Sequence, residues 1–172
     1  MAGWFLTKYR QNGTVIWNRP FGPVATPAGL AIDAAQNVIV AGTTNYYRDG
    51  GPILVKYDPN GNVLWNKGVM AGKNPFRFTT DFAQNSAGEF FVVGSDAGAE
   101  PGEIFVAKLT ANGALGWARS VPVTPVSWLF TDACLAPTAG GGVYVACNVM
   151  LARFNSAGQK LWQRPGQFVA LA

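Results

Sequence analysis

The sequence repeats itself, and this repeat constrains the fold more than any other feature. A 14-residue segment that reads LTKYRQNGTVIWNR at positions 6–19 returns in related form at 54–67, 106–119 and 151–164. Each copy has β-rich residues on both sides of Asn-Gly or, in the last copy, Ala-Gly. Asn-Gly between such runs is a strong hairpin signal, because a type I′ turn needs positive φ at both central residues. The repeat therefore predicts four β-hairpins.

Counting outward from these turns places a basic residue opposite a tryptophan in every hairpin. A cation beside an indole across a strand pair is favourable by roughly 0.5–1 kcal/mol at exposed sites. Because the same register recurs in each copy, we interpret these residues as structural rather than as a ligand site. The predicted pairs are Lys8 with Trp17, Lys56 with Trp65, Lys108 with Trp117, and Arg153 with Trp162.

A second kind of segment lies between the hairpins, at 30–42, 82–94 and 132–147. Each copy reads as a strand, a tight turn and a strand, with Asn, Gly or Ser in the turn. The full period is 45 to 52 residues and holds four short strands, without helical periodicity. This period and strand count are typical of a propeller blade, so the fold class predicted is all-β.

The segments NVIVAGTTN (37–45) and ILVKYDPNGNVLW (53–65) resemble the bacterial SBBP-type (seven-bladed) β-propeller repeat family. The tryptophan hairpins are also similar to the repeats of quinoprotein-type propellers. The resemblance covers nearly the whole chain, best at 37–67 and 89–119. It implies inner A and B strands in the 30–42 type of segment and outer C and D strands in the hairpins. It implies no catalytic residues.

This phase gives a single propeller domain over 1–172, with an N-terminal half blade. We expect a half blade at 5–19, three complete blades at about 28–69, 78–121 and 128–165, and a possible closing strand at 167–172. Three blades cannot close a ring, since propellers use four or more. The half blade and the last strand could meet within one chain, giving four blades. They could also meet across chains, which we prefer, or the chain could dock as a partial propeller on a larger complex.

The B–C and D–A connections are longer than the A–B and C–D turns, and function tends to lie on long loops. Tyrosine and arginine are favoured at contact hot spots. We therefore expect a binding surface on this loop face, with the alternative that its aromatic residues only pack the loops. The candidate anchors are Tyr46, Tyr47, Arg48, Phe76 and Arg77.

Several kinds of chemistry find no support in the composition. There is no histidine, which removes Ser-His-Asp and Cys-His catalysis. The two cysteines, Cys134 and Cys147, fall on adjacent predicted strands and are interpreted as buried thiols rather than a disulfide. Asp33, Asp81 and Asp132 could line a channel and hold a cation, but we favour hydrogen bonds to loop backbone. No cofactor or metal is expected.

The preferred function is a non-catalytic interaction or structural subunit that binds a protein or glycan and completes its ring by self-assembly. A net charge of only +4, carried mostly by repeat positions, does not favour nucleic acid. No apolar run is long enough for a membrane span and no secretory signal is evident, so we expect a soluble protein, cytoplasmic or part of a particle. The alternatives are a phage or virus-like particle component, a lectin-like module, and a carboxylate-based glycan-processing enzyme. The enzyme would draw its acids from Asp33, Asp49, Asp81, Asp96, Glu100, Glu103 and Asp132.

Overall fold

The computed structural model describes residues 4–21, 26–44, 51–69, 77–96, 102–123 and 133–166. These residues form fourteen β-strands and no helix, which confirms the all-β prediction. Across the same ranges, no helix has the length and hydropathy needed to span a bilayer.

The strands form three four-stranded sheets and one two-stranded hairpin, all antiparallel and paired in chain order. We call the hairpin β1–β2 the N-terminal hairpin, and β3–β6, β7–β10 and β11–β14 the first, second and third blades. The bounds are β1 Phe5–Tyr9, β2 Val15–Pro20, β3 Thr26–Ile32, β4 Val38–Thr43, β5 Pro52–Tyr57, β6 Val63–Gly68, β7 Arg77–Gln84, β8 Phe90–Asp96, β9 Glu103–Leu109, β10 Leu115–Pro122, β11 Cys134–Pro137, β12 Val143–Cys147, β13 Met150–Phe154 and β14 Lys160–Pro165.

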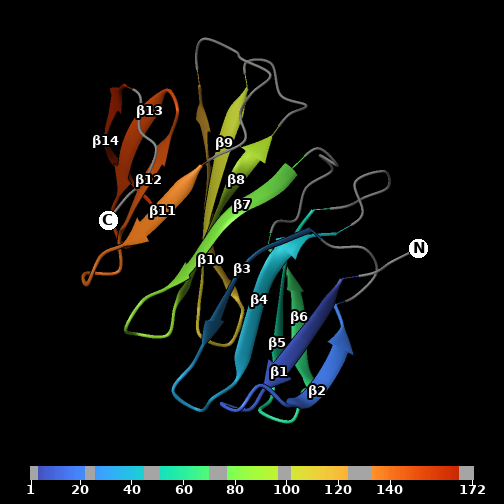
Figure 1. Cartoon of the computed structure of the whole chain (residues 1–172). Coiled ribbons are helices and arrows are strands. Elements are labelled where there is room, and N and C mark those ends of the chain that lie inside the picture. Colours follow the sequence, from blue (N-terminus) through green and yellow to red (C-terminus); the bar gives the residue numbers. More distant parts are fainter. Residues whose placement is uncertain are drawn as a thin grey trace.

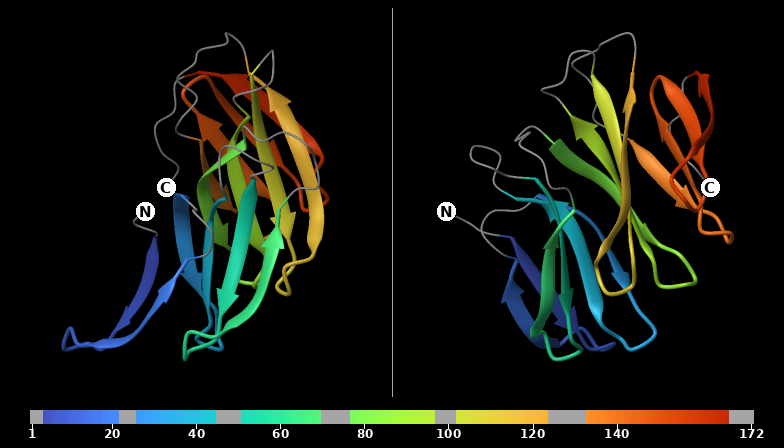
Figure 2. Two further views of the ribbon diagram at one scale, coloured as in Figure 1. Left: turned by 90° about the vertical axis from the view of Figure 1, so that its right-hand side faces the viewer. Right: turned by 180° about the vertical axis from the view of Figure 1, so that it is seen from behind.

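The blades stand side by side as an open arc, with the N-terminal hairpin at one end and the third blade at the other (Figures 1 and 2). The first strands of the blades, β3, β7 and β11, contact one another in turn on the inner side. The A–B and C–D turns of every blade lie at one end of the strands, and the B–C and D–A connections lie at the other (Figure 1). The B–C connection of the third blade is only Asn148-Val149.

The hairpin turns share one geometry, and it differs from the type I′ turn expected. In the turn 58–62, the Gly61 amide donates to the Asp58 carbonyl at 3.0 Å, and the Asp58 amide donates to the Asn62 carbonyl at 2.8 Å. Positive φ falls on Gly61 and not on Asn60. A type I turn followed by a left-handed glycine explains this pattern, so the type I′ prediction is wrong. The same bonds recur in the turns 10–14, 33–37, 85–89, 110–114, 138–142 and 155–159.

The predicted register is nevertheless confirmed, because a β-bulge compensates for the longer turn. In the first blade Tyr57 pairs with Val63, whereas Lys56 pairs with Trp65, so Leu64 is an extra residue on the outer strand. The bulge restores the count that a two-residue turn would have given. The pairs Lys8–Trp17, Lys108–Trp117 and Arg153–Trp162 are formed in the same way.

The hydrophobic core lies between successive sheets rather than within one layer. One cluster lies between the first and second blades. The first blade contributes Ile39 and Leu54 from the face that points to the second blade, and the second blade contributes Phe90 and Phe105 from the face that points back. Equivalent clusters join the second blade to the third and the N-terminal hairpin to the first blade. Each cluster therefore joins one sheet to the next sheet along the chain.

Candidate functional site

The expected loop-face anchors fall mainly beyond what the structure describes. Tyr46, Tyr47, Arg48 and Phe76 lie outside the described residues. Arg77 begins β7, where its backbone pairs with Asp96. The B–C loop of the first blade has a closed base, because the Thr44 amide donates to the Gly51 carbonyl at 3.0 Å and the Gly51 amide donates to Thr44 Oγ1 at 3.0 Å.

The repeated tryptophan joins each blade to the C–D turn of the next. Trp17 Nε1 donates to the carbonyl of Pro59, 2.9 Å away, and Lys8 Nζ donates to the same carbonyl at 3.0 Å. Arg19 Nε donates to the carbonyl of Gly61 at 3.1 Å. A Cβ at Gly61 would lie 2.9 Å from the Trp17 ring, so the bare turn packs directly on the indole. We call this arrangement the turn–tryptophan junction.

The junction recurs along the described chain. Between the second and third blades, Trp117 Nε1 donates to the Ser156 carbonyl at 3.0 Å and Arg119 Nε donates to the Gly158 carbonyl at 2.9 Å. Between the first and second blades, a Cβ at Gly113 would lie 3.1 Å from the Trp65 ring. A buried indole N–H needs such an acceptor, and the turn carbonyl supplies it. The junction is therefore a standard connection between blades.

The cation over the tryptophan ring is not the one expected from the register. In three hairpins it is the arginine two residues further along the same strand, with its guanidinium carbon 5.9 Å from the ring centre; these are Arg19 over Trp17, Arg119 over Trp117 and Arg164 over Trp162. The cross-strand residues have other partners as well: Lys56 lies 2.7 Å from Asp33, Lys108 lies 2.9 Å from Glu89, and Arg153 lies over the Tyr144 ring.

The described acids hold turns and blades together. Asp33 Oδ1 accepts hydrogen bonds from the amides of Ala35 and Asn37, both at 2.9 Å. Burial raises the pKa of Asp33, but hydrogen bonds from Lys56 and Asn37 outweigh it and lower the pKa to about 2. Burial also acts against ionised Glu89, and hydrogen bonds from Lys108 and Asn85 lower its pKa.

Asp81 connects two blades through backbone hydrogen bonds. Its Oδ1 accepts from the Phe82 amide at 2.7 Å, and its Oδ2 accepts from the Leu135 amide of the third blade at 2.9 Å. The interpretation that the aspartates bond loop backbone is therefore confirmed for Asp33. Asp81 bonds strand backbone instead, and Asp132 lies outside the described residues. Within the described ranges, no three acidic or cysteine side chains cluster as metal ligands would.

The cysteines lie on neighbouring strands of the third blade, as predicted. Cys134 on β11 pairs with Ala146 on β12, and Cys147 ends β12. Both are thiols, and Cys147 is buried.

The N-terminal end of the arc exposes side chains that complete blades bury. Tyr9 is 58% exposed, whereas its counterparts Tyr57, Leu109 and Phe154 are at most 2% exposed. These positions lie on the face that packs against a preceding blade, and the N-terminal hairpin has none before it among the described residues. Phe5 on the same face is also exposed.

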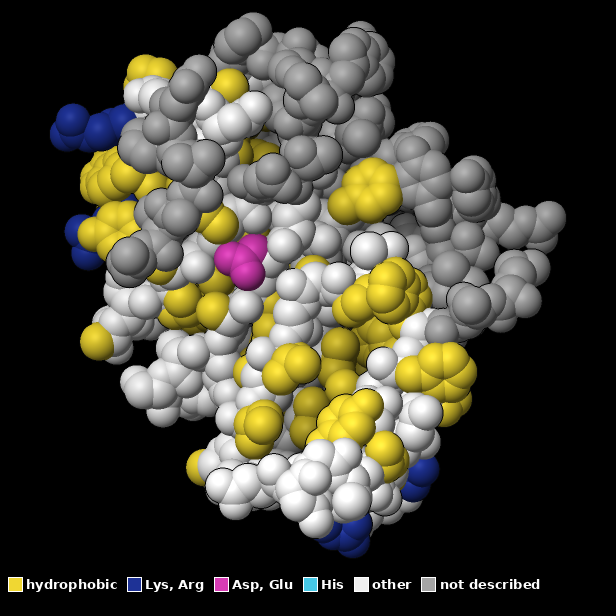
Figure 3. Space-filling view, viewed as in Figure 1, with side chains coloured by type: hydrophobic (Ala, Val, Ile, Leu, Met, Phe, Trp, Pro, Cys, Tyr) yellow, Lys and Arg dark blue, Asp and Glu magenta, His cyan; other side chains and the backbone are white. Residues whose placement is uncertain are grey.

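A groove lies between β1 and the first blade. Two adjoining hollows of about 230 and 430 Å³ share Leu6 and Leu30 in their linings. Leu30 is 61% exposed, whereas its counterpart Phe82 is 7% exposed. Figure 3 shows hydrophobic side chains gathered around this hollow. The groove occupies the place where the inner A and B strands of the N-terminal half blade would lie.

The opposite end exposes half of a turn–tryptophan junction. Trp162 is partly exposed and packs on Tyr144 of its own blade, with ring centres 5.9 Å apart. Arg164 lies over the Trp162 ring, as Arg119 lies over Trp117. Within the described residues, no hairpin turn follows β14 to cover them.

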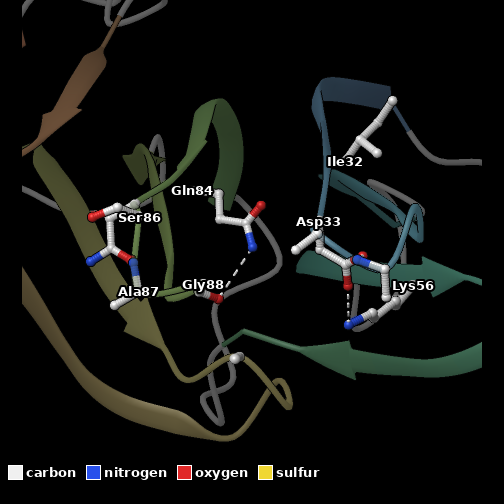
Figure 4. Close-up of a pocket in the computed structure, with 11 residues that line it drawn as sticks. Ile32, Asp33, Lys56, Gln84, Ser86, Ala87 and Gly88 are labelled. Atoms are coloured by element: carbon white, nitrogen blue, oxygen red, sulfur yellow. Dashed lines mark hydrogen bonds and ion pairs between the residues drawn. The ribbon is translucent and has the colours of Figure 1, made fainter.

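A third hollow, of about 500 Å³, lies between the inner turns 33–37 and 85–89 (Figure 4). Three of its polar side chains have partners within the chain: Asp33 pairs with Lys56, and Gln84 Nε2 donates to the Gly88 carbonyl at 3.4 Å. This internal pairing favours a gap between structural turns over a preformed ligand site.

Comparisons with known proteins were made by sequence and by structure. The sequence matches no protein-family model, and a search of curated proteins found no match. The WD40 domain of Neurospora crassa Pan2 has a similar structure, with a TM-score of 0.56 and 11% identity over 95% of this chain. The chain has the β-propeller fold. It spans 45% of the length of the Pan2 domain.

Two further solved structures resemble the propeller more weakly. A protein of unknown function from Bacteroides caccae gives a TM-score of 0.36 with 16% identity, over 90% of this chain and 72% of its own. A gluconolactonase from Xanthomonas campestris gives a TM-score of 0.36 with 13% identity, over 93% and 68%.

Sequence reasoning missed the arginines of the junction, although a signal was present. Each hairpin carries a basic residue two positions after its tryptophan: Arg19, Lys67, Arg119 and Arg164. Residues two apart on a strand share a face, so this repetition could have placed the cation beside the indole. The acceptors could not have been found in this way, because they lie about 40 residues further along the chain.

Proposed function

We propose that this propeller is a non-catalytic assembly and interaction subunit that completes its ring with further copies of itself. The exposure of Tyr9 carries the proposal, because the same strand position is buried in every complete blade. Phe5 on the same face is exposed too, and exposed apolar side chains gathered on a sheet face favour a protein contact. The exposed half junction at Trp162 supports a contact at the other end of the arc as well.

Assembly between chains fits the shape of the arc better than closure within one chain. The N-terminal hairpin and the third blade lie at opposite ends of the molecule (Figure 2). Each chain supplies three blades and a hairpin, hence four blade positions, and two chains would supply eight. Rings of four to eight blades are typical of propellers.

The roles of the acids support a non-catalytic subunit over a carboxylate enzyme. A glycan-processing site of that kind needs two acids converging in one cleft. Asp33 is paired with Lys56 and bonded to its own turn, and Asp81 accepts two backbone amides. These contacts support a structural role for both acids. A phage or virus-like particle is one setting in which such a subunit could serve.

Partner binding is the second part of the proposal and is placed on the long-loop face. We propose that Tyr46, Tyr47, Arg48, Phe76 and Arg77 contribute contacts to a protein or glycan there. The support is the residue chemistry, together with a rigid blade scaffold that presents the loops.

The native mass in solution tests self-assembly. Size-exclusion chromatography with light scattering, run from about 1 to 100 µM, should give a discrete multiple of the 18.3 kDa chain mass. A dimer would match the eight-position ring. A mass of 18.3 kDa across the whole range would contradict self-assembly and favour closure within the chain or docking on another protein.

A further inference from the structure

The two ends of the arc are complementary halves of one junction. We propose that the exposed face of the third blade, carrying Trp162 and Arg164, is the docking surface for the N-terminal hairpin of a second copy. This inference rests on the proposed self-assembly and names the residues that perform it. The junctions within the described chain provide the template.

The first element of the template is an aromatic sandwich. Trp117 contacts Phe91 of its own blade, with ring centres 6.4 Å apart, and stacks on Phe154 of the next blade at 6.0 Å. Trp162 already has the equivalent of the first contact, since it lies 5.9 Å from Tyr144. Phe154 is the last residue of β13, and the last residue of β1 is Tyr9. A docked hairpin would place Tyr9 on the open side of Trp162.

The second element is the arginine contact to the turn. Arg19 and Arg119 each donate from Nε to the carbonyl of a left-handed glycine, Gly61 and Gly158. Arg164 occupies the same position after Trp162, and Gly13 is the left-handed glycine of the N-terminal hairpin. Arg164 Nε would therefore donate to the Gly13 carbonyl of the second copy.

The third element is the space above the glycine. In the formed junctions a Cβ on the glycine would collide with the indole, at 2.9 Å for Gly61 and 2.5 Å for Gly158. At Gly13, no described atom lies within 4 Å of the equivalent position. The N-terminal turn thus has the bare surface that an indole requires, without an indole on it.

A second copy fits this surface because the hairpin already carries the right residues at each position. In the formed junction, Phe154 and Gly158 of the third-blade hairpin pack on Trp117. Tyr9 and Gly13 occupy the same two positions in the N-terminal hairpin. The two surfaces lie at opposite ends of one chain, so the contact is heterologous and propagates head to tail. It closes to a ring if the rotation per copy permits.

Two variants test the contact, each of which damages one end. Trp162→Ala removes the indole. Gly13→Asn keeps a residue that tolerates positive φ but fills the space that the indole would occupy. In light-scattering runs, each variant by itself should show an apparent association constant at least about thirtyfold weaker than that of the unmodified protein, as for loss of a hot-spot residue. Circular dichroism of each variant checks that the fold is retained.

Mixing the two variants provides the decisive comparison. The Trp162→Ala chain keeps its turn and the Gly13→Asn chain keeps its indole, so an equimolar mixture should regain association through one intact junction per pair. Gly88→Asn is the matched control, because it adds the same side chain at a left-handed glycine of an inner turn, φ 78°, and should assemble normally.

The outcomes separate this contact from the proposed function. If the unmodified protein assembles and both variants assemble equally well, the ring is completed through another surface and the junction contact is wrong. If the variants are weakened and their mixture does not recover, the two ends do not meet each other. If the unmodified protein is monomeric throughout, self-assembly itself fails.

Discussion

At the scale of single residues, the lysines of the first and second blades show how a repeated position acquires different partners. In the first blade, Lys56 pairs with Asp33 of the inner turn 33–37. In the second blade, Lys108 pairs with Glu89 of the inner turn 85–89. The described part of the half blade includes no inner turn, and Lys8 donates to the Pro59 carbonyl of the neighbouring blade instead. The acids are ionised within these contacts, so the inner turns depend on their charge.

Asp33→Asn is expected to remove a pH-dependent part of the stability. The folded pKa of Asp33 is about 2, below the ordinary 3.8, so its contribution is complete above pH 4 and is lost as the pH falls towards 2. We expect the variant to be about 1–2 kcal/mol less stable at pH 7 and nearly equal to the unmodified protein at pH 2. Urea unfolding at pH 7, 4, 3 and 2 measures the difference. A difference that stays constant with pH would show that the ion pair does not contribute.

At the scale of elements, the unit that repeats is a hairpin with a bulge, and its turn is also a contact surface. The left-handed glycine serves both purposes, since it permits the turn and brings the backbone onto the indole. This double role explains why the last copy keeps Gly158 although Ala157 replaces the usual asparagine.

Substituting alanine at two of these glycines should separate the roles. Gly13→Ala and Gly158→Ala carry similar strain from positive φ, about 1 kcal/mol. Gly158→Ala also places its Cβ 2.5 Å from Trp117, and overpacking of this kind costs about 1–3 kcal/mol more. Urea unfolding in the Trp162→Ala background, where docking is blocked, should show the larger loss for Gly158→Ala. Equal losses would mean that the turn yields without strain.

Much of this element could be predicted from the sequence, and the remainder has identifiable physical reasons. The hairpins and the Lys56–Trp65 register followed from Asn-Gly between β-rich runs. The turn type did not, because Asn-Gly suits several turns and the bulge at Leu64 masks the difference in length. The hydrogen-bond acceptor of Trp17 could not be predicted, because Pro59 is distant in sequence and only the packing of successive sheets brings it near.

At the scale of the whole molecule, one end of the strands carries the tight turns and the other carries the longer connections (Figure 1). The number of complete blades was predictable, because each one combines a copy of the inner strand–turn–strand segment with a copy of the hairpin. Whether the arc closes on itself was not, because closure depends on the rotation accumulated over all the blades. The exposure of Tyr9 and Leu30 follows from that open geometry rather than from any local pattern.

Loss of glycan or protein binding on changing the loop face would support partner binding there. A glycan array probed with the intact protein and with Tyr46→Ala/Tyr47→Ala should show weaker binding by the variant if these residues are anchors. Val63→Ala, an exposed position on the outer strand β6, is the control and should bind normally. If the intact protein binds no glycan on the array, the glycan part of the proposal is wrong.

The turn–tryptophan junction also determines how such a molecule can change its length. Each junction forms between the tryptophan hairpin of one sheet and the C–D turn of the next, so the same contact can form at any position along the arc. Duplicating one period of 45 to 52 residues would add a blade without any new contact having to be invented. Fusing two copies end to end would likewise turn an association between molecules into a fold within one. The same junction could thus join blades within one chain or blades of two chains.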